Sequence, residues 1–217
     1  MSNVVIRNKV LINSNKKYFR TGAEKTLVGA YGKKEKVVLK SKYLFRHSEL
    51  SFNNAAIQVY GPYELNTEKT KKADFDVPAD TPVASGSANV TYEQMKSQEL
   101  KFIELYISGA PLIDAINNDN EALSYLRSQG EIARIVDCVF VAIESEFHSK
   151  IDFNSDINAT STANGIEISV KLKVAIGMES SLKLAPKTTI AYGLVAPIWN
   201  NEKTKVIDLE PDLRGAG

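Results

Sequence analysis

Apolar and polar residues alternate along two arms of the sequence, on either side of a polar stretch at residues 154–165. The outgoing arm runs from Ile143 to Phe153 and the return arm from Ile166 to Ile176, which gives 11 residues to each. Since successive side chains of a strand point to opposite faces, each arm predicts a strand with one apolar face. Together the arms predict a β-hairpin with a loose tip. Its apolar face comprises Phe147, Ile151, Phe153, Ile166, Ile168, Val170, Leu172 and Val174.

This alternation has two interpretations. An antiparallel sheet shows it when one face packs on the core and the other meets water. A membrane-spanning β-strand also shows it, over about 9–11 residues, with one face toward lipid. The residues opposite the apolar face, such as Glu167, Lys171 and Lys173, agree with both interpretations. The pattern by itself therefore leaves a core surface and a membrane surface open.

Further strands are predicted along most of the chain. A continuous apolar run at residues 135–143 is typical of a strand covered on both faces. The opening residues 1–17 fit either a short strand or an irregular helix, and the Gly-Pro pair at 61–62 predicts a turn. Shorter β-like runs lie at residues 36–45, 55–63, 98–109 and 187–199.

One region of the chain predicts helices. Pro111 suits a first helical turn and Gly130 suits a C-terminal cap, while residues 117–120 are expected to divide the region into two short helices. Helices and strands together predict an α+β fold with a twisted, mainly antiparallel central sheet and a few short helices. We expect a single domain over residues 1–199 and a C-terminal tail over residues 200–217.

The composition is that of a globular protein, with 217 residues of which 43% are hydrophobic and 24% charged. No stretch approaches 18 apolar residues, so no transmembrane helix is expected. The N-terminus lacks the apolar core of a secretory signal, and the single Cys138 cannot form an internal disulfide. We therefore expect the resting protein to be cytoplasmic.

The net charge of +1 conceals a strong asymmetry along the chain. Residues 1–46 carry twelve Lys and Arg against two Glu, which makes them about +10 and the remainder about −9. Such a separation favours an anionic partner for the N-terminal part, either a membrane surface or a nucleic acid. A solvated basic face that balances acidic neighbours in the same fold is the alternative.

Signals for catalysis are weak. The chain has two histidines, His47 and His148, and its one cysteine lies in an apolar run, which favours a buried structural thiol over a Cys–His nucleophile. Phosphate-binding, zinc-protease and serine-hydrolase motifs are absent. Residues 74–80 hold three Asp without the Gly and Glu of a calcium loop, so we expect a solvated loop there. We expect no enzyme, no cofactor and no metal.

Three stretches carry a resemblance to a known family. They are KVVLKSKYLF (36–45), SYLRSQGEIARIVDCVFVAIES (124–145) and SSLKLAPKTTIAYGLVAPIW (180–199). The last resembles a gasdermin segment in which a Pro-containing turn leads into a strand, and the middle one resembles the helix and strand before the second transmembrane hairpin. From about residue 73 to residue 209, the order of features resembles the pore-forming N-terminal domain of the gasdermins, including the short bacterial members.

The resemblance implies an autoinhibited cytoplasmic monomer. Once activated, it would bind anionic membrane lipid, form a homo-oligomer and insert two regions, about 73–107 and 139–176, as a large β-pore that causes cell death. The tail at 200–217 would be an autoinhibitory peptide, released by a protease or a partner protein. The implied lipid-binding residues are Arg7, Lys9, Lys16, Lys17, Lys33, Lys34, Lys36, Lys40, Lys42 and Arg46.

Two other classes of function remain open. A binding module could use the basic segment for nucleic acid, although its aromatic residues are also good core residues, and stacking on bases needs exposed rings. A structural protein could assemble through exposed strand edges. We expect membrane lipid rather than nucleic acid as the partner. The aromatic residues in question are Tyr18, Phe19, Tyr31, Tyr43 and Phe45.

Overall fold

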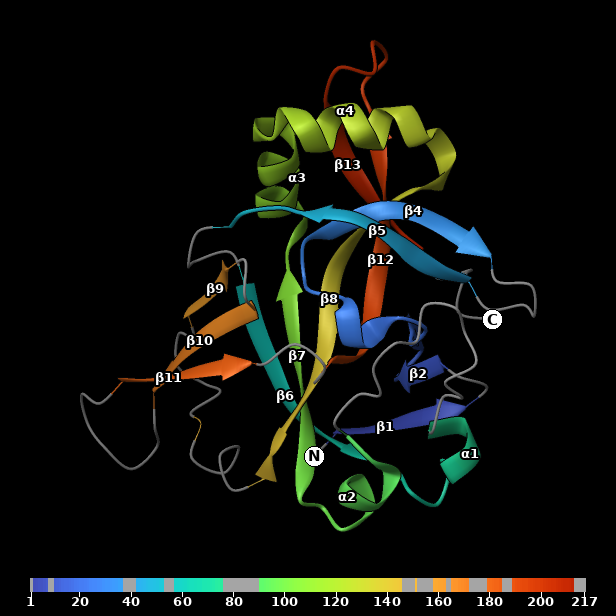
Figure 1. Ribbon diagram of the computed structural model, residues 1–217, viewed down its shortest axis with the longest axis vertical. Helices are drawn as coiled ribbons and strands as arrows, with labels where there is room; N and C mark the ends of the chain where they lie inside the picture. The colour runs from blue at the N-terminus through green and yellow to red at the C-terminus, as the bar shows by residue number, and fades with distance from the viewer. Residues whose placement is uncertain are drawn as a thin grey trace.

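A computed structural model describes most of the chain, and Figure 1 shows its elements. The described residues are 2–7, 10–36, 42–52, 57–75, 90–145, 151, 158–162, 165–171, 179–184 and 189–212. The strands are β1 (Ser2–Arg7), β2 (Val10–Asn13), β3 (Lys16–Phe19), β4 (Ala30–Lys36), β5 (Lys42–Glu49), β6 (Ile57–Leu65), β7 (Leu100–Ile107), β8 (Ala133–Glu144), β9 (Asn158–Thr162), β10 (Gly165–Lys171), β11 (Glu179–Leu184), β12 (Thr189–Trp199) and β13 (Val206–Pro211). The helices are α1 (Lys72–Phe75), α2 (Tyr92–Lys96), α3 (Gly109–Asn118) and α4 (Asn120–Gln129), with short 3₁₀ turns η1 (Ala23–Lys25) and η2 (Gly130–Ile132).

The main sheet has ten strands in the order β13-β12-β3-β2-β1-β6-β7-β8-β4-β5. A further pairing of β12 with β8 closes β12, β3, β2, β1, β6, β7 and β8 into a ring. Among the described strands, β1 and β6 run parallel and the other pairs are antiparallel. The predicted α+β class, with a mainly antiparallel sheet and short helices, is confirmed.

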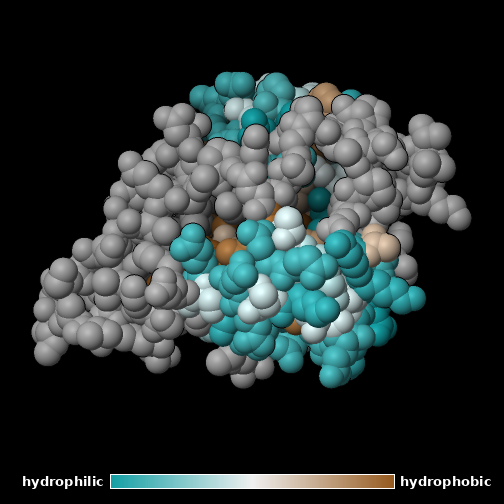
Figure 2. Space-filling model, turned by 60° about the horizontal axis from the view of Figure 1, so that its bottom comes forward, coloured by the Kyte–Doolittle hydropathy of each residue, from teal (hydrophilic) through white to brown (hydrophobic). Residues whose placement is uncertain are grey.

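The closed part of the sheet has an apolar interior. Phe102 of β7 and Phe140 of β8 are fully buried there, and the ring of Tyr18 packs edge-on against Phe140 with 4.7 Å between ring centroids. Phe75 of α1 and Met95 of α2 join the same cluster, so these helices cover one end of it. Figure 2 brings that end forward: the described surface is mainly hydrophilic, with hydrophobic residues visible in a hollow near its centre.

A second core, here called the outer core, lies on the outer side of β7, β8 and β12. Leu105 of β7 packs there with Leu112 of α3 and Leu126 of α4. Figure 1 shows α3 and α4 at the opposite end from α1 and α2, above β4 and β5. Since β8 contributes to both cores, every residue from 135 to 143 except Asp137 is buried. The continuous apolar run predicted this double coverage.

The predicted helical region forms two helices, as expected. The break falls at Asp119, whose carboxylate accepts hydrogen bonds from the N–H groups of Glu121 and Ala122, each at 3.0 Å. It thereby satisfies amide groups that a helix start leaves without partners. Gly130 follows α4 with a φ of +55°, a conformation that favours glycine. The opening residues, for which strand and helix were both open, form β1 and β2.

The predicted turn at 61–62 is wrong. β6 continues through this Gly-Pro pair, and its register with β7 shifts between Tyr60 and Tyr63. Gly61 has a φ of +139°, and a Cβ there would lie 3.1 Å from the carbonyl oxygen of Phe102. The pair forms a bulge within a strand, because pairing with β7 resumes beyond it and holds the chain extended.

The predicted hairpin also differs from the structure. β8 ends at Glu144, and Ser145 is not part of a strand, so the outgoing arm does not run on as one strand toward Ile151. β10, the described part of the return arm, pairs instead with β9 and β11 in a separate three-stranded sheet. The remaining parts of the arms, 146–150, 152–153 and 172–176, lie outside the described residues.

The predicted loose tip contains strand β9. Thr162 of β9 pairs with Gly165 of β10, which leaves two residues between them in the sequence. The β-branched Thr160 and Thr162 favour a strand, and the Asn-Gly dipeptide at 164–165 is typical of tight hairpin turns. These local preferences outweighed the longer alternation on which the predicted hairpin depended.

Gly32 is expected to be indispensable for the pairing of β4 with β5. The register of the two strands shifts between Tyr31 and Gly32, and a Cβ on Gly32 would lie 2.1 Å from the carbonyl oxygen of Phe45. That oxygen cannot move aside without separating the strands. Gly32→Ala should therefore lower the free energy of unfolding, measured in urea, by about 1–3 kcal/mol.

Gly109→Ala is the matched control, because no atom beyond its chain neighbours and its own helix backbone lies within 4 Å of the position its Cβ would take. It should change the free energy of unfolding by less than about 1 kcal/mol. Equal losses from the two substitutions would contradict the close approach of β4 and β5.

Candidate functional site

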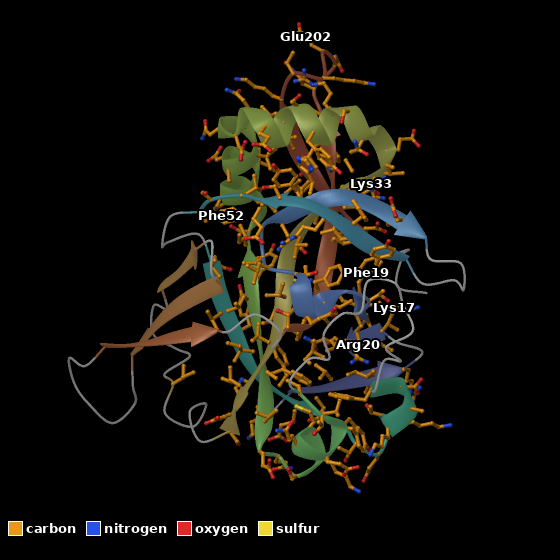
Figure 3. All side chains as sticks on the ribbon, in the orientation of Figure 1. Lys17, Phe19, Arg20, Lys33, Phe52 and Glu202 are labelled. Atoms are coloured by element: carbon orange, nitrogen blue, oxygen red, sulfur yellow. The ribbon has the colours of Figure 1, made fainter. Side chains whose placement is uncertain are left out.

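The implied lipid-binding residues are divided between two parts of the sheet, β1–β3 and β4–β5. Lys16 and Lys17 are exposed on β3. Arg7 is exposed at the end of β1, where its Nε donates to the carbonyl of Lys69 at 3.3 Å. Figure 3 shows Lys17 and Lys33 at different levels of the molecule. Lys36 and Lys42 occupy the last position of β4 and the first of β5, and Lys9 and Lys40 lie outside the described residues.

Lys33 and Arg46, on β4 and β5, each face a carboxylate. Nζ of Lys33 lies 2.7 Å from Oε1 of Glu35 and 5.3 Å from the ring centroid of Phe45. The hydrogen bond from Lys33 holds the pKa of Glu35 below its ordinary value. Arg46 forms an ion pair with Glu49. Exposed ion pairs stabilise a fold only weakly, so these cations can exchange their carboxylates for another anion at small cost.

Lys34 belongs to a more buried cluster at the end of the last strand, here called the Asp212 clasp. Nζ of Lys34 and Nε of Arg134 both contact Oδ2 of Asp212, the latter at 2.6 Å. The side chains of Lys34, Arg134 and Asp212 are 14%, 12% and 5% exposed. Burial opposes ionisation of Asp212, but the hydrogen bonds from the two cations hold its pKa below the ordinary value.

The Asp212 clasp holds the C-terminal end of β13 in place, and Asn117 of α3 binds its N-terminal end. The side chain of Asn117 donates to the carbonyl of Val206 and accepts from the N–H of the same residue, both at 2.9 Å. Next to the clasp, the N–H of Asp212 donates to the carbonyl of Leu194 at 2.8 Å. The tail is thus an attached edge strand as far as Asp212, and its inhibitory role stays a prediction.

The interior of the closed sheet also holds acidic residues. Glu104 of β7 accepts a hydrogen bond from the hydroxyl of Tyr63 at 3.1 Å, and Oδ1 of Asp137 is buried without a hydrogen-bond partner. Burial raises the pKa values of both carboxyl groups, and burial with the nearby Glu104 raises the pKa of Tyr63 to about 12. Ionised carboxylates in such surroundings cost free energy.

Cys138 lies beside these acids and is 3% exposed. Burial, with a further contribution from Asp137, raises the pKa of its thiol, which makes it a poor nucleophile. His47 stacks on Tyr125 with 3.8 Å between ring centroids, and His148 lies outside the described residues. In the part of the chain that the structure describes, no group of three or more His, Cys, Asp or Glu could hold a metal ion.

The predicted membrane-inserting residues lie in two places. Ile151 is 1% exposed and packs in the outer core. Ile166, Ile168 and Val170 occupy alternate positions of β10, and the first two pair with leucines of β11. None of the described helices is long and apolar enough to cross a membrane. Phe147, Phe153, Leu172 and Val174 lie outside the described residues.

No protein-family model, curated protein or solved structure matches the chain. The site therefore rests on its own geometry. Sequence reasoning missed Asn117, Arg134 and Asp212, because a single polar residue carries no motif and their contacts span 78 to 178 positions in the sequence. The opposite charges of the N-terminal part and the remainder were the one signal that pointed toward such pairs.

Asp212→Asn should weaken the attachment of β13. It leaves Lys34 and Arg134 with a neutral partner, so we expect a loss of about 1–3 kcal/mol in the free energy of unfolding at pH 7. Since the folded-state pKa of Asp212 is lowered, its contribution is present above the unfolded value of about 3.9 and is lost as the pH falls through the folded-state value. Urea unfolding at several pH values should show the two proteins converging at acid pH.

Asp208→Asn is the control for this measurement, because Asp208 is an exposed carboxylate on the same strand. It should leave the free energy of unfolding within about 0.5 kcal/mol of the wild type. A loss in Asp212→Asn that stays constant down to the most acid pH would contradict a contribution from the charge of Asp212.

Glu104→Gln should stabilise the protein at neutral pH. The raised folded-state pKa means that the wild type is most stable below the unfolded value of about 4.3 and loses stability as the pH rises through the folded-state value. Gln keeps an acceptor for the hydroxyl of Tyr63 without a buried charge. At pH values above the folded-state pKa of Glu104, we expect the substitution to raise the free energy of unfolding by about 1 kcal/mol. At acid pH we expect no gain, and unfolding measured at several pH values checks both.

The control is Glu99→Gln, at an exposed position just before β7, which should change little at any pH. A Glu104→Gln protein that is less stable than the wild type at neutral pH would show that the carboxylate stabilises the interior instead.

Proposed function

We propose that this chain is a gasdermin-like pore-forming protein. It rests in the cytoplasm and, once its tail is released, binds anionic lipid of the cell membrane and assembles into a homo-oligomer. Hairpins from the two regions at about 73–107 and 139–176 then insert to form a large pore that kills the cell, a role suited to antiviral defence. The proposal is supported by the connectivity of the sheet, the pattern of β10 and the position of the tail.

The observation that carries the proposal is where the second region joins the body. β8 and β12 are antiparallel neighbours, and Val141 near the end of β8 pairs with Thr189 at the start of β12. The chain between Glu144 and Thr189 therefore leaves the sheet and returns to it at one place. Antiparallel neighbours can lengthen into a hairpin by continuing their own ladder of hydrogen bonds. The rest of the sheet need not rearrange for this extension.

The first region joins the body in the same way. β6 and β7 are antiparallel neighbours, with Tyr63 paired to Phe102, and the connection between them contains α1 and α2. Because Phe75 and Met95 of these helices cover the interior core, they must leave it when β6 and β7 extend. Exposing each such side chain costs about 1.5–3 kcal/mol, which keeps the resting state favoured until lipid is bound.

The resting arrangement of β10 supports a change of strand partners on activation. β9, β10 and β11 form a sheet of their own, which Figure 1 shows to one side of the main sheet. Apolar residues at 166, 168 and 170 alternate with Glu167, Ser169 and Lys171, the pattern that a membrane strand requires. Three strands are about the fewest that form a stable sheet, so little strand pairing has to be broken for its conversion.

The tail provides a means of control. In the Asp212 clasp, Lys34 is bound to a carboxylate of the chain itself, so this implied lipid contact is occupied. Removal of β13 would free Lys34 and Arg134, and a cation near an anionic membrane contributes about 1 kcal/mol. The turn from Asn200 to Lys205, between β12 and β13, is largely exposed and therefore accessible to a protease.

A disulfide between β10 and β11 tests the proposal. Ser169 and Ser181 are paired positions, and the Cα atoms of antiparallel pairs lie about 4.5–5.5 Å apart, within reach of a disulfide. The variant S169C/S181C, with a specific protease site in the exposed turn, is cleaved and added to dye-filled vesicles that contain phosphatidylserine. We expect no leakage from the oxidised protein and full leakage after reduction, because a β10 held to β11 cannot join a longer hairpin.

Cleaved wild type and cleaved Ser169→Cys are the matched controls, and both should leak under either redox condition. Cys138 should not interfere, since it is 3% exposed. Leakage from the oxidised double variant would show that β10 stays on β11 in the active form. Absence of leakage from every cleaved protein would overturn the pore-forming function.

A further inference from the structure

Arg20 joins the bases of the two proposed hairpin regions. The base of a region is the place where the region meets the rest of the sheet. It directly follows β3 and is 7% exposed, and Figure 3 labels its side chain. Its Nε donates to the carbonyl of Ile190 at 3.3 Å. Its Nη1 and Nη2 donate to the carbonyls of Asp74 and Phe75, both at 2.8 Å. The guanidinium carbon also lies 5.1 Å from the ring centroid of Phe75.

The acceptors mark where each region meets the body. Asp74 and Phe75 end α1, at the start of the first region, and the last carbonyls of a helix have no partner within it. Ile190 is the second residue of β12, where the chain returns from the second region. The planar fork of a guanidinium can reach acceptors on two elements at once. One side chain therefore holds both bases.

Burial of Arg20 makes these contacts depend on one another. If one base moves away, the guanidinium stays buried with fewer acceptors, and a buried charge that loses hydrogen bonds is strongly unfavourable. The state in which both bases have moved, and water reaches the guanidinium, avoids this penalty. Release of one base therefore favours release of the other, which is a coupling free energy between the two regions.

We propose that Arg20 couples the two regions, so that they leave the resting fold together and a protein with one region extended is rarely populated. The assignment of these segments as hairpin regions rests on the proposed function. The coupling itself is a property of the resting protein in solution.

Hydrogen exchange in solution, without lipid, tests the coupling. Peptides that cover residues 66–75 and 189–194 report on the two bases, and a peptide from α4, which lies outside both regions, reports on global unfolding. In the full-length wild type at low urea, we expect the two base peptides to exchange at the same rate, with the same urea dependence, and at least about tenfold faster than α4. Different rates or urea dependences of the two base peptides in the wild type would overturn the proposal.

Arg20→Lys keeps the charge but loses the fork, and it should separate the exchange rates of the two base peptides by about tenfold. Arg127→Lys is the matched control, because Arg127 also donates to a carbonyl, that of Thr204 at 3.5 Å, and also lies over a ring, that of Trp199. It should leave both peptides unchanged. Equal rates in a folded Arg20→Lys protein would overturn the role of Arg20, and the wild-type measurement decides on coupling even if this variant does not fold.

Vesicle leakage, measured beside exchange, distinguishes the two proposals. Coupled exchange without leakage from any cleaved protein would overturn the pore-forming function and leave the coupling in place. Leakage together with uncoupled exchange in the wild type would overturn the coupling alone.

Discussion

β8 can be stable only where both its faces and both its edges are covered, because almost every side chain from 135 to 143 is apolar and its main-chain groups need partners. β7 and β4 pair along one edge and β12 pairs along the other. The pairing with β12 closes the sheet into a ring, which creates the interior core. The outer face then requires α3, α4 and the β4–β5 pair as cover.

The same constraint separates the strands around β8 from two segments that each start and end on neighbouring strands of the sheet. Strands on either side of β8 hold the body together, and each proposed hairpin region starts and ends on neighbouring strands of that body. Polar contacts between distant parts of the chain fix these segments in the resting arrangement. Arg20 holds the bases of both regions, and Asn117 and Asp212 hold the C-terminal strand.

The sequence correctly predicted those elements whose pattern of residues fits only one kind of structure. The apolar run at 135–143 predicted a strand that is covered on both faces, and β8 is such a strand. Pro111 and Gly130 correctly marked the start and end of a helical region. The turn at 61–62 was wrong because β7 keeps β6 extended through a Gly-Pro pair that would turn in isolation. The long hairpin was wrong for the resting state because β10 pairs with β9, which lies in the predicted tip, and with β11.

The sequence by itself determined the class of fold, the double burial of β8 and the two-faced character of β10, because periodicity and composition are local properties of the chain. Only the tertiary structure decided which strands are neighbours, that Asp212 contacts Lys34 and Arg134, and that Arg20 meets Asp74, Phe75 and Ile190. Closure of the ring brings together residues as distant in the sequence as Lys34 and Asp212, which are 178 positions apart. A single polar side chain forms no periodic pattern, so the sequence does not show so distant a partner.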